Sequence, residues 1–158
     1  MLFTEILGNK NDLTPEELAG VTEDFYELHN IDLVKRIQRG TTVGGREIGL
    51  RLSNDVRELR HGDILHFADG LLITVRTLPT DVIVIKPKSV YEMGVVAHSL
   101  GNRHLQAQFF DADSEYGQPV MVVQYDHTVE HFLDHAGTEY TREDRVMPEA
   151  FRHAEHSH

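Results

Sequence analysis

The sequence predicts an α+β protein with a β-rich N-terminal domain over residues 1–77 and a ferredoxin-like βαββαβ domain over residues 78–148. Up to residue 77, short apolar runs alternate with glycine-containing turns, which is typical of a β domain. Leu78-Pro79-Thr80-Asp81 interrupts this pattern and is interpreted as a linker. Beyond it, two helical patterns alternate with extended runs in the order β-α-β-β-α-β. Residues 149–158 contain too few apolar side chains to fold alone, and we expect a flexible tail there.

Turn and cap signals place the elements of the first part. Residues 2–7 form a short apolar run, and Thr14-Pro15 marks a helix start, because Thr caps a helix and Pro is tolerated in its first turn. Gly20 interrupts that helix, and an extended pattern returns over residues 33–37. Gly44-Gly45 indicates a hairpin turn. Later strands are predicted by alternating or turn-bounded apolar residues at 48–52, 64–67 and 71–75.

The second part begins with an apolar strand over residues 82–86. Ser89 and Glu92 then have the spacing of a capping box, so a helix is predicted from there to Leu100. Gly101 follows, and a glycine after a helical pattern is a C-cap signal because it enters the left-handed conformation without steric cost. The remaining elements are predicted as strands over 105–110 and 119–124, a helix from Asp126 to Gly137, and a last strand from Tyr140.

Composition limits the classes of function. The formal net charge of the 158 residues is -11, which disfavours binding to nucleic acid or to an anionic membrane. The absence of cysteine excludes disulfides and thiolate metal sites, so a metal site must use imidazole, carboxylate or backbone oxygen. Neither a signal peptide nor an apolar run of the ~20 residues needed to span a bilayer is visible, and a cytoplasmic location is expected.

Histidine is enriched, with 11 in the chain, and the position of His104 is the most informative. It follows the predicted helix in the turn Gly101-Asn102-Arg103-His104, where no helical or strand periodicity forces a side chain into the core. A lone turn histidine is more often an ordinary surface residue than a ligand. One imidazole also binds metal weakly, whereas a two-fold axis can bring it together with its own copy from a second chain.

The segment 93–108 resembles the signature of the UreE family of urease accessory metallochaperones. The similarity is carried by Gly101-Asn102-Arg103-His104 and a glutamine soon afterwards, with Gln106 standing where the family more often has proline. Residues 46–50 and 59–65 are similar to the N-terminal half of that family. The resemblance implies a non-enzymatic nickel carrier, homodimeric through its C-terminal domain, with His104 at the two-fold axis. It implies partners too: the urease accessory GTPase and the urease maturation complex, with the β-rich domain as a docking surface.

A second candidate is His127-Thr128-Val129-Glu130-His131, which matches the inverted zinc-protease motif H-x-x-E-H. Histidines at i and i+4 share a helix face and can chelate zinc. The pattern continues to His135, and apolar residues lie on the other side, so a solvated polar face is the simpler interpretation. A small zinc-dependent hydrolase remains the alternative function. The family resemblance implies that His127 is an accessory metal ligand.

The last candidate is the C-terminal tail, which carries His153, His156 and His158. Histidine-rich tracts bind nickel, copper and zinc without fixed geometry, but an acidic tail with incidental histidines is an equal alternative. The predicted function is delivery of Ni²⁺ for urease assembly by His104 with these tail histidines, and a general metal buffer is a further alternative. Imidazole ligands do not separate Ni²⁺ from Zn²⁺ or Cu²⁺, so the choice of nickel comes from the resemblance.

Overall fold

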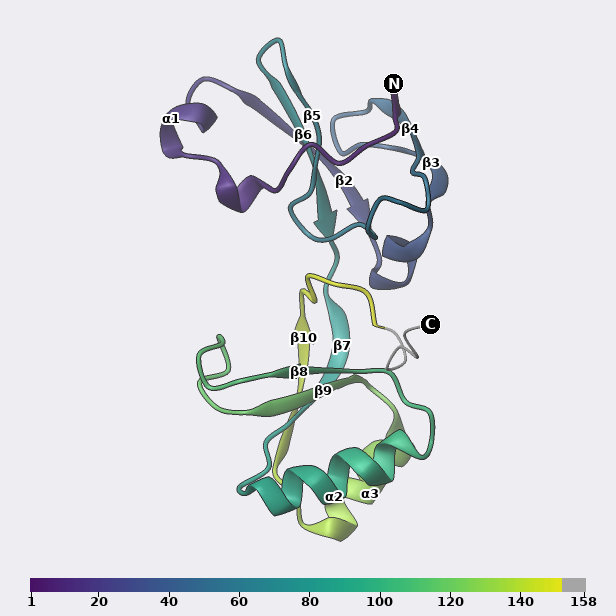
Figure 1. The fold of residues 1–158 in the computed structure, drawn as a ribbon, viewed down its shortest axis with the longest axis vertical. Helices are drawn as coiled ribbons and strands as arrows, with labels where there is room; N and C mark the ends of the chain where they lie inside the picture. The colour runs from purple at the N-terminus through teal and green to yellow at the C-terminus, as the bar shows by residue number, and fades with distance from the viewer. Residues whose placement is uncertain (152–158) are drawn as a thin grey trace. The chain divides into compact units, whose positions relative to one another are not determined.

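The computed structural model of the chain describes residues 1–151 and divides into two compact units (Figure 1). The first unit comprises Met1–Pro79 together with Val146–Ala150. Among the described residues, the second unit comprises Thr80–Arg145 and Phe151. The segment Val146–Ala150, which the sequence-based division assigned to the second domain and the tail, therefore clusters with the first unit. Both units are mixtures of strands and short helices, as the α+β prediction requires.

The first unit contains two three-stranded sheets, with strand orders β1-β4-β3 and β2-β6-β5. In the first sheet, β3 and β4 form an antiparallel hairpin and β1 pairs with β4 in parallel. In the second, β5 and β6 form an antiparallel hairpin and β2 pairs with β6 in parallel. The elements are β1 (Leu2–Phe3), η1 (Lys10–Asp12), α1 (Pro15–Leu18), β2 (Thr22–Leu28), η2 (Asn30–Val34), β3 (Ile37–Thr41), β4 (Glu47–Arg51), β5 (Ile64–Ala68) and β6 (Leu71–Thr77).

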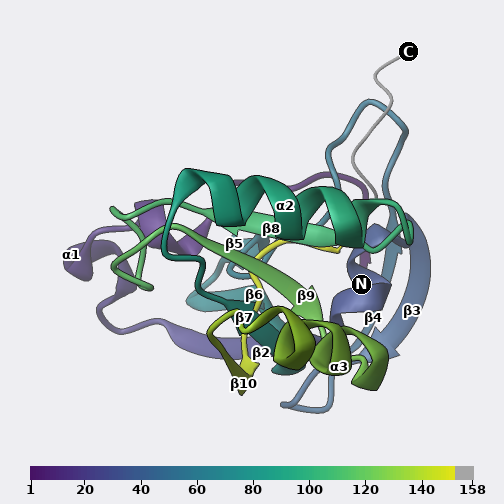
Figure 2. The same cartoon turned by 90° about the horizontal axis from the view of Figure 1, so that it is seen from below.

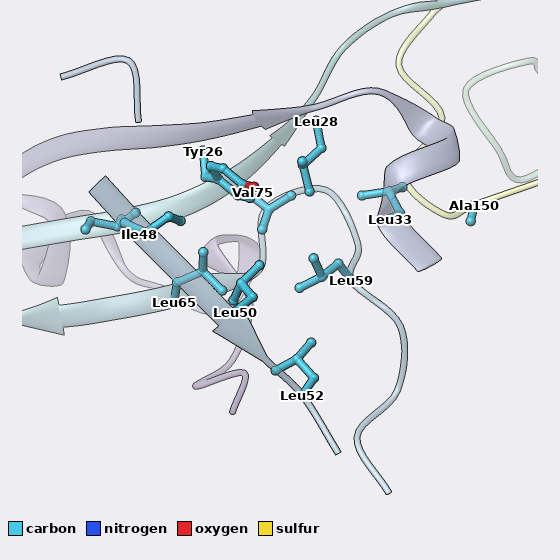
Figure 3. Close-up of a cluster of buried hydrophobic side chains, with 11 residues drawn as sticks. Tyr26, Leu28, Leu33, Ile48, Leu50, Leu52, Leu59, Leu65, Val75 and Ala150 are labelled. Atoms are coloured by element: carbon cyan, nitrogen blue, oxygen red, sulfur yellow. The ribbon is translucent and has the colours of Figure 1, made fainter. Parts of the chain in front are cut away.

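Side chains from these strands, from η2 and from loops build one hydrophobic core (Figure 3). Burial of its aliphatic side chains stabilises the unit, since each fully buried Leu or Ile contributes roughly 1.5–3 kcal/mol. Ala150 belongs to the same cluster, which explains why the segment after β10 (Tyr140–Arg145) clusters with the first unit. The buried members are Tyr26, Leu28, Leu33, Ile48, Leu50, Leu52, Leu59, Leu65, Ile73, Val75 and Ala150.

The structure differs from the sequence-based expectation at three places in this unit. The strand expected over residues 2–7 covers only Leu2–Phe3. Of the extended pattern expected over residues 33–37, Leu33 and Val34 end the 3-10 helix η2, and the strand begins only at Ile37. Strand β2 was not predicted. Every second residue of β2 from Asp24 onward is buried, as expected for a strand with one face in the core. Because Asp24 is charged, the sequence does not show the alternation of apolar and polar residues by which such a strand is recognised.

Asp24 ties the two sheets of the first unit together. From β2 it accepts hydrogen bonds from the Thr42 hydroxyl at 2.5 Å and the Gly44 N–H at 2.8 Å, both in the β3–β4 turn. The Arg46 guanidinium donates to the same carboxylate at 2.8 Å. Burial alone would raise the pKa of Asp24, but these hydrogen bonds, with one from the Phe25 N–H, lower the pKa to about 2. The Gly44-Gly45 turn predicted from the sequence is therefore held by a residue of another strand.

Replacing Asp24 by asparagine is expected to destabilise the protein in a pH-dependent way. A carboxylate whose folded pKa is about 2, against an ordinary 3.8, contributes stability above pH ~4 and loses it as the pH falls toward 2. The variant should unfold with about 2 kcal/mol less free energy at pH 7, and this gap should close between pH 4 and 2. Urea denaturation across this range measures it, with the exposed Asp12→Asn as control. A gap that does not change with pH would contradict the role of the ionised carboxylate.

The second unit is a four-stranded sheet of order β10-β7-β9-β8, in which all neighbours are antiparallel. Its two helices cover one face of that sheet (Figures 1 and 2). Together with the β-α-β-β-α-β order, this is the ferredoxin-like arrangement predicted from the sequence. The elements are β7 (Thr80–Ile85), α2 (Val90–Gly101), β8 (Ala107–Phe110), β9 (Val120–Gln124), α3 (His127–Ala136) and β10.

The core of this unit lies between the sheet and the helices. Alternate residues of the two central strands pack against the inner faces of α2 and α3. This agrees with the side-chain period of two residues in a strand and of 3.6 residues in a helix. The buried cluster is Ile83, Ile85, Val96, Leu100, Met121, Val123, Val129 and Leu133.

The caps of the second unit largely follow the sequence signals. The Ser89 hydroxyl accepts from the Glu92 N–H at 3.0 Å, but the Glu92 carboxylate accepts from the N–H of Lys88 instead of closing the box on Ser89. Gly137 ends α3 in the left-handed conformation, at φ 69°. Strand β7 already begins at Thr80, so only Leu78-Pro79 of the predicted linker lies between strands.

Candidate metal centre

His104 lies at the end of a tight turn that follows α2. The chain leaves the helix through hydrogen bonds from the N–H of Arg103 to the Leu100 carbonyl at 3.0 Å and from the N–H of His104 to the Gly101 carbonyl at 2.9 Å. His104 itself has φ 59°, a left-handed conformation that few residues other than glycine adopt. Its side chain is exposed. The backbone thus presents the imidazole on the surface and not in the core.

The left-handed position of this turn is not the one that the sequence indicates. Gly101 is the last residue of α2, and the C-cap Asn102 keeps a right-handed conformation at φ -63°. The conformation that favours glycine falls three residues after Gly101, on His104. Backbone conformations of this kind cost of order 1 kcal/mol or more and concentrate at functional sites. The strain therefore adds a structural reason to regard His104 as functional.

His104 borders a shallow pocket of about 240 Å³ whose lining comes from two short segments. One segment leads into β8 and the other follows β9. Because these strands are antiparallel neighbours with Ala107 opposite Val123, the residues before one and after the other meet at the same sheet edge. The lining residues are His104, Leu105, Gln106, Gln124, Tyr125 and Asp126.

The pocket offers an imidazole, a carboxylate and amide oxygens, all of which can ligate a divalent metal. Asp126 caps α3 and accepts hydrogen bonds from the hydroxyl of Thr128 at 2.5 Å and its N–H at 2.7 Å, which lower the pKa of the Asp126 carboxyl. It is therefore ionised at neutral pH. Gln124 and Tyr125 were not singled out from the sequence, although their place directly before a helix cap at a strand end is a usable signal.

Tyr125 has a defined orientation in this pocket wall. The Arg142 guanidinium lies 3.5 Å from the centre of its ring, and the phenol donates a hydrogen bond of 3.2 Å to Glu130. Desolvation and the hydrogen bond to that carboxylate both raise the pKa of Tyr125, so the phenol is neutral at physiological pH. Arg142 is held in turn by a bidentate ion pair with Asp81.

The three histidines of α3 lie on its solvent-exposed side. His127, His131 and His135 are exposed, while Val129 and Leu133 of the same helix are buried. The rings of His131 and His135 are in edge contact, with centroids 4.4 Å apart. Glu130, the acid of the H-x-x-E-H motif, accepts the hydrogen bond from Tyr125 described above. This arrangement is that of a polar surface, and within the described residues it does not favour the hydrolase alternative.

The predicted site residues are thus only partly brought together. Within residues 1–151, no three His, Cys, Asp or Glu side chains form a group that could hold a metal ion. His104 reaches the pocket beside Asp126, and His127 follows directly after Asp126 without lining that pocket. The tail histidines His153, His156 and His158 lie outside the described residues.

Comparisons with known proteins support the family resemblance found in the sequence, and they do so over the whole chain. Residues 3–78 match the family described as UreE urease accessory protein, N-terminal domain. A urease accessory protein UreE of Corynebacterium urealyticum is 66% identical over 158 residues, covering all of both chains. Proteins of the same name are 60% identical in Pseudarthrobacter chlorophenolicus, again over the full length of both, and 49% identical in Staphylococcus carnosus, over 99% of that protein.

The fold and these full-length similarities define an accessory protein of urease maturation. The chain belongs to the UreE family. The similarity predicted from the Gly-Asn-Arg-His turn is thereby confirmed and extends over both units. None of the helices in the described part of the chain is long and apolar enough to cross a membrane.

Proposed function

We propose that this protein is a nickel-binding metallochaperone that carries Ni²⁺ to the urease active site during its assembly. The observation that carries the proposal is the exposed, left-handed His104 beside the Asp126 pocket, in a chain that belongs to a family of urease accessory proteins. Nickel is cargo in this proposal. The protein acts as a carrier and not as a catalyst.

A shared site explains how so few ligands in one chain can hold an ion. Homodimerisation through the second unit would bring His104 of two chains to a two-fold axis, where each chain supplies the same imidazole. The tail histidines His153, His156 and His158 would complete the coordination, and His127 would act as an accessory ligand. Such a set of nitrogen ligands, drawn partly from a tail, lets the ion leave as well as enter. It would also accept Zn²⁺ or Cu²⁺, since affinity alone follows the Irving–Williams order.

The first unit has a different proposed role. It contains no residue of the candidate metal set, and we assign to it the docking of partner proteins, including the urease accessory GTPase and the urease maturation complex. This division of labour leaves metal binding to the second unit and the tail.

A urease activation assay tests the proposal. Apo-urease with its other accessory proteins is supplied with limiting Ni²⁺, with and without this protein. The protein is expected to raise the activity formed several-fold at limiting nickel and to lose this effect when nickel is saturating, because delivery then no longer limits assembly. A general metal buffer would withhold nickel and lower the activity. That result, or no effect at any nickel concentration, would contradict the carrier function.

A further inference from the structure

The outer face of the sheet β1-β4-β3 combines exposed apolar side chains with arginine. The strand register places Ile37 opposite Arg51 and Arg39 opposite Gly49, and β1 places Leu2 beside Gly49. Of the apolar members, Ile37 is 73% exposed and Leu2 is 63% exposed. We define the outer face as Leu2, Ile37, Arg39, Glu47, Gly49 and Arg51.

Arg39 and Arg51 are exceptional among the basic residues of the first unit. Within residues 1–151 neither has a hydrogen bond or ion pair with an acidic group. Every other basic side chain of this unit has such a partner or donates to a backbone carbonyl. The partners are Glu23 for Lys10, Asp32 for Lys35, Asp24 for Arg46, Asp63 for Arg57, Glu149 for Arg60, Glu27 for Arg76, and the Ser53 carbonyl for Arg36.

Two unpaired arginines on one face are unexpected in a chain with 26 acidic and 15 basic residues. Because acidic groups are in excess, pairing elsewhere in the unit is nearly complete, and this face remains cationic. The shape fits a docking surface as well. Gly49 has no side chain, and a Cβ there would lie 3.4 Å from Leu2 and 3.8 Å from Arg39, so the centre of the face stays flat between them.

We propose that this outer face docks an acidic segment of a partner protein in urease maturation, with carboxylates on Arg39 and Arg51 and an apolar side chain against Ile37 and Leu2. The inference rests on the proposed partner-docking role of the first unit and specifies its surface and chemistry. Arg pairs with carboxylates in a bidentate geometry, and a mixed arginine and apolar patch is typical of protein interfaces. The exposed apolar side chains of Leu2 and Ile37 on this face favour a protein segment over nucleic acid, whose contacts with proteins are mostly to phosphate and sugar.

The test reverses both charges in the full chain, as Arg39→Glu with Arg51→Glu. The probe is the purified complex of apo-urease with its other accessory proteins, immobilised for biolayer interferometry. Wild-type protein is expected to bind in a salt-dependent manner, and the double variant at least tenfold more weakly. The matched control is Lys86→Glu with Lys88→Glu, which changes the net charge equally on the second unit and should bind as the wild type does.

Nickel titration by calorimetry separates this inference from the proposed function. All variants should bind nickel as the wild type does, because the outer face contains no candidate ligand. Equal binding of the double variant and the wild type to the complex would overturn the inference, as would failure of the wild type to bind. If the wild type and the control variant are dimers and the Arg39→Glu, Arg51→Glu variant is a monomer, the face binds a second copy of this chain and the inference is wrong. Salt-dependent binding of the wild type to duplex DNA or phosphatidylserine vesicles, and not to the complex, would also overturn it.

Discussion

Replacement of His104 by alanine is expected to lower the affinity for Ni²⁺ by at least about 100-fold. Loss of an outer-shell partner of a metal ligand typically costs 10–100-fold, and the proposed shared site loses a direct ligand from each of two chains. The change should leave the fold intact, since His104 is exposed and alanine keeps the N–H bonded to the Gly101 carbonyl. Isothermal titration of the metal-free protein with Ni²⁺ measures the effect.

The control for this experiment is His131→Ala. His131 is also an exposed histidine of the second unit, and its ring contacts only His135 among the interactions of the described chain. We expect nickel affinity to change less than threefold in this variant. If tight binding survives in His104→Ala and is lost in His131→Ala, the metal site is on α3 and the carrier proposal fails.

The stoichiometry of the wild type adds an independent readout. A site formed by two copies of His104 predicts one tightly bound ion for two chains, and sedimentation should give a dimer in the presence of nickel. A monomer that binds one ion with full affinity would exclude a shared site. The His104→Ala variant should remain a dimer if the imidazole binds metal and does not itself hold the interface.

The sequence predicted the second unit better than the first, for a physical reason. In the second unit the apolar residues follow clear periods, and the signals at Ser89, Asp126 and Gly137 mark helix ends in both sequence and structure. In the first unit, strand β2 contains Asp24, whose inward carboxylate is satisfied by Thr42 and Arg46 from the β3–β4 turn. Hydrogen bonds from residues so distant in sequence cannot be recognised from the residues around Asp24.

The candidate site, too, could be predicted from the sequence only in part. His104 was predicted from its turn and its resemblance to a known signature, but the pocket beside it could not be. Gln124 and Tyr125 join His104 only because β8 and β9 pair in one particular register. The backbone conformation was also misplaced, since the sequence indicates Gly101 as the left-handed residue and the turn puts that conformation on His104.

Replacement of Asp63 by alanine is expected to lower the free energy of unfolding by about 3 kcal/mol. Asp63 is completely buried. Its carboxylate accepts two hydrogen bonds from the Arg57 guanidinium, at 2.8 and 2.9 Å, and one from the Arg60 N–H at 2.7 Å. The Asn9 side chain donates a fourth at 3.3 Å. One side chain therefore connects the start of β5 to two separate loops.

Removing this carboxylate leaves the Arg60 N–H without its partner and creates a cavity, and both effects favour unfolding. The Asn9 amide keeps its hydrogen bond of 3.0 Å to the His61 carbonyl. The Arg57 side chain is 40% exposed and can return to water, so the loss should lie at the lower end of the 3–5 kcal/mol that broken buried ion pairs cost. Urea denaturation followed by circular dichroism measures it, with the exposed Asp55→Ala of the same loop changing stability by less than about 0.5 kcal/mol. Equal stability of the two variants would show that the network contributes nothing. Because Asp63 is remote in sequence from the proposed nickel ligands and lies in the other unit, folded Asp63→Ala protein should still bind Ni²⁺ with unchanged affinity.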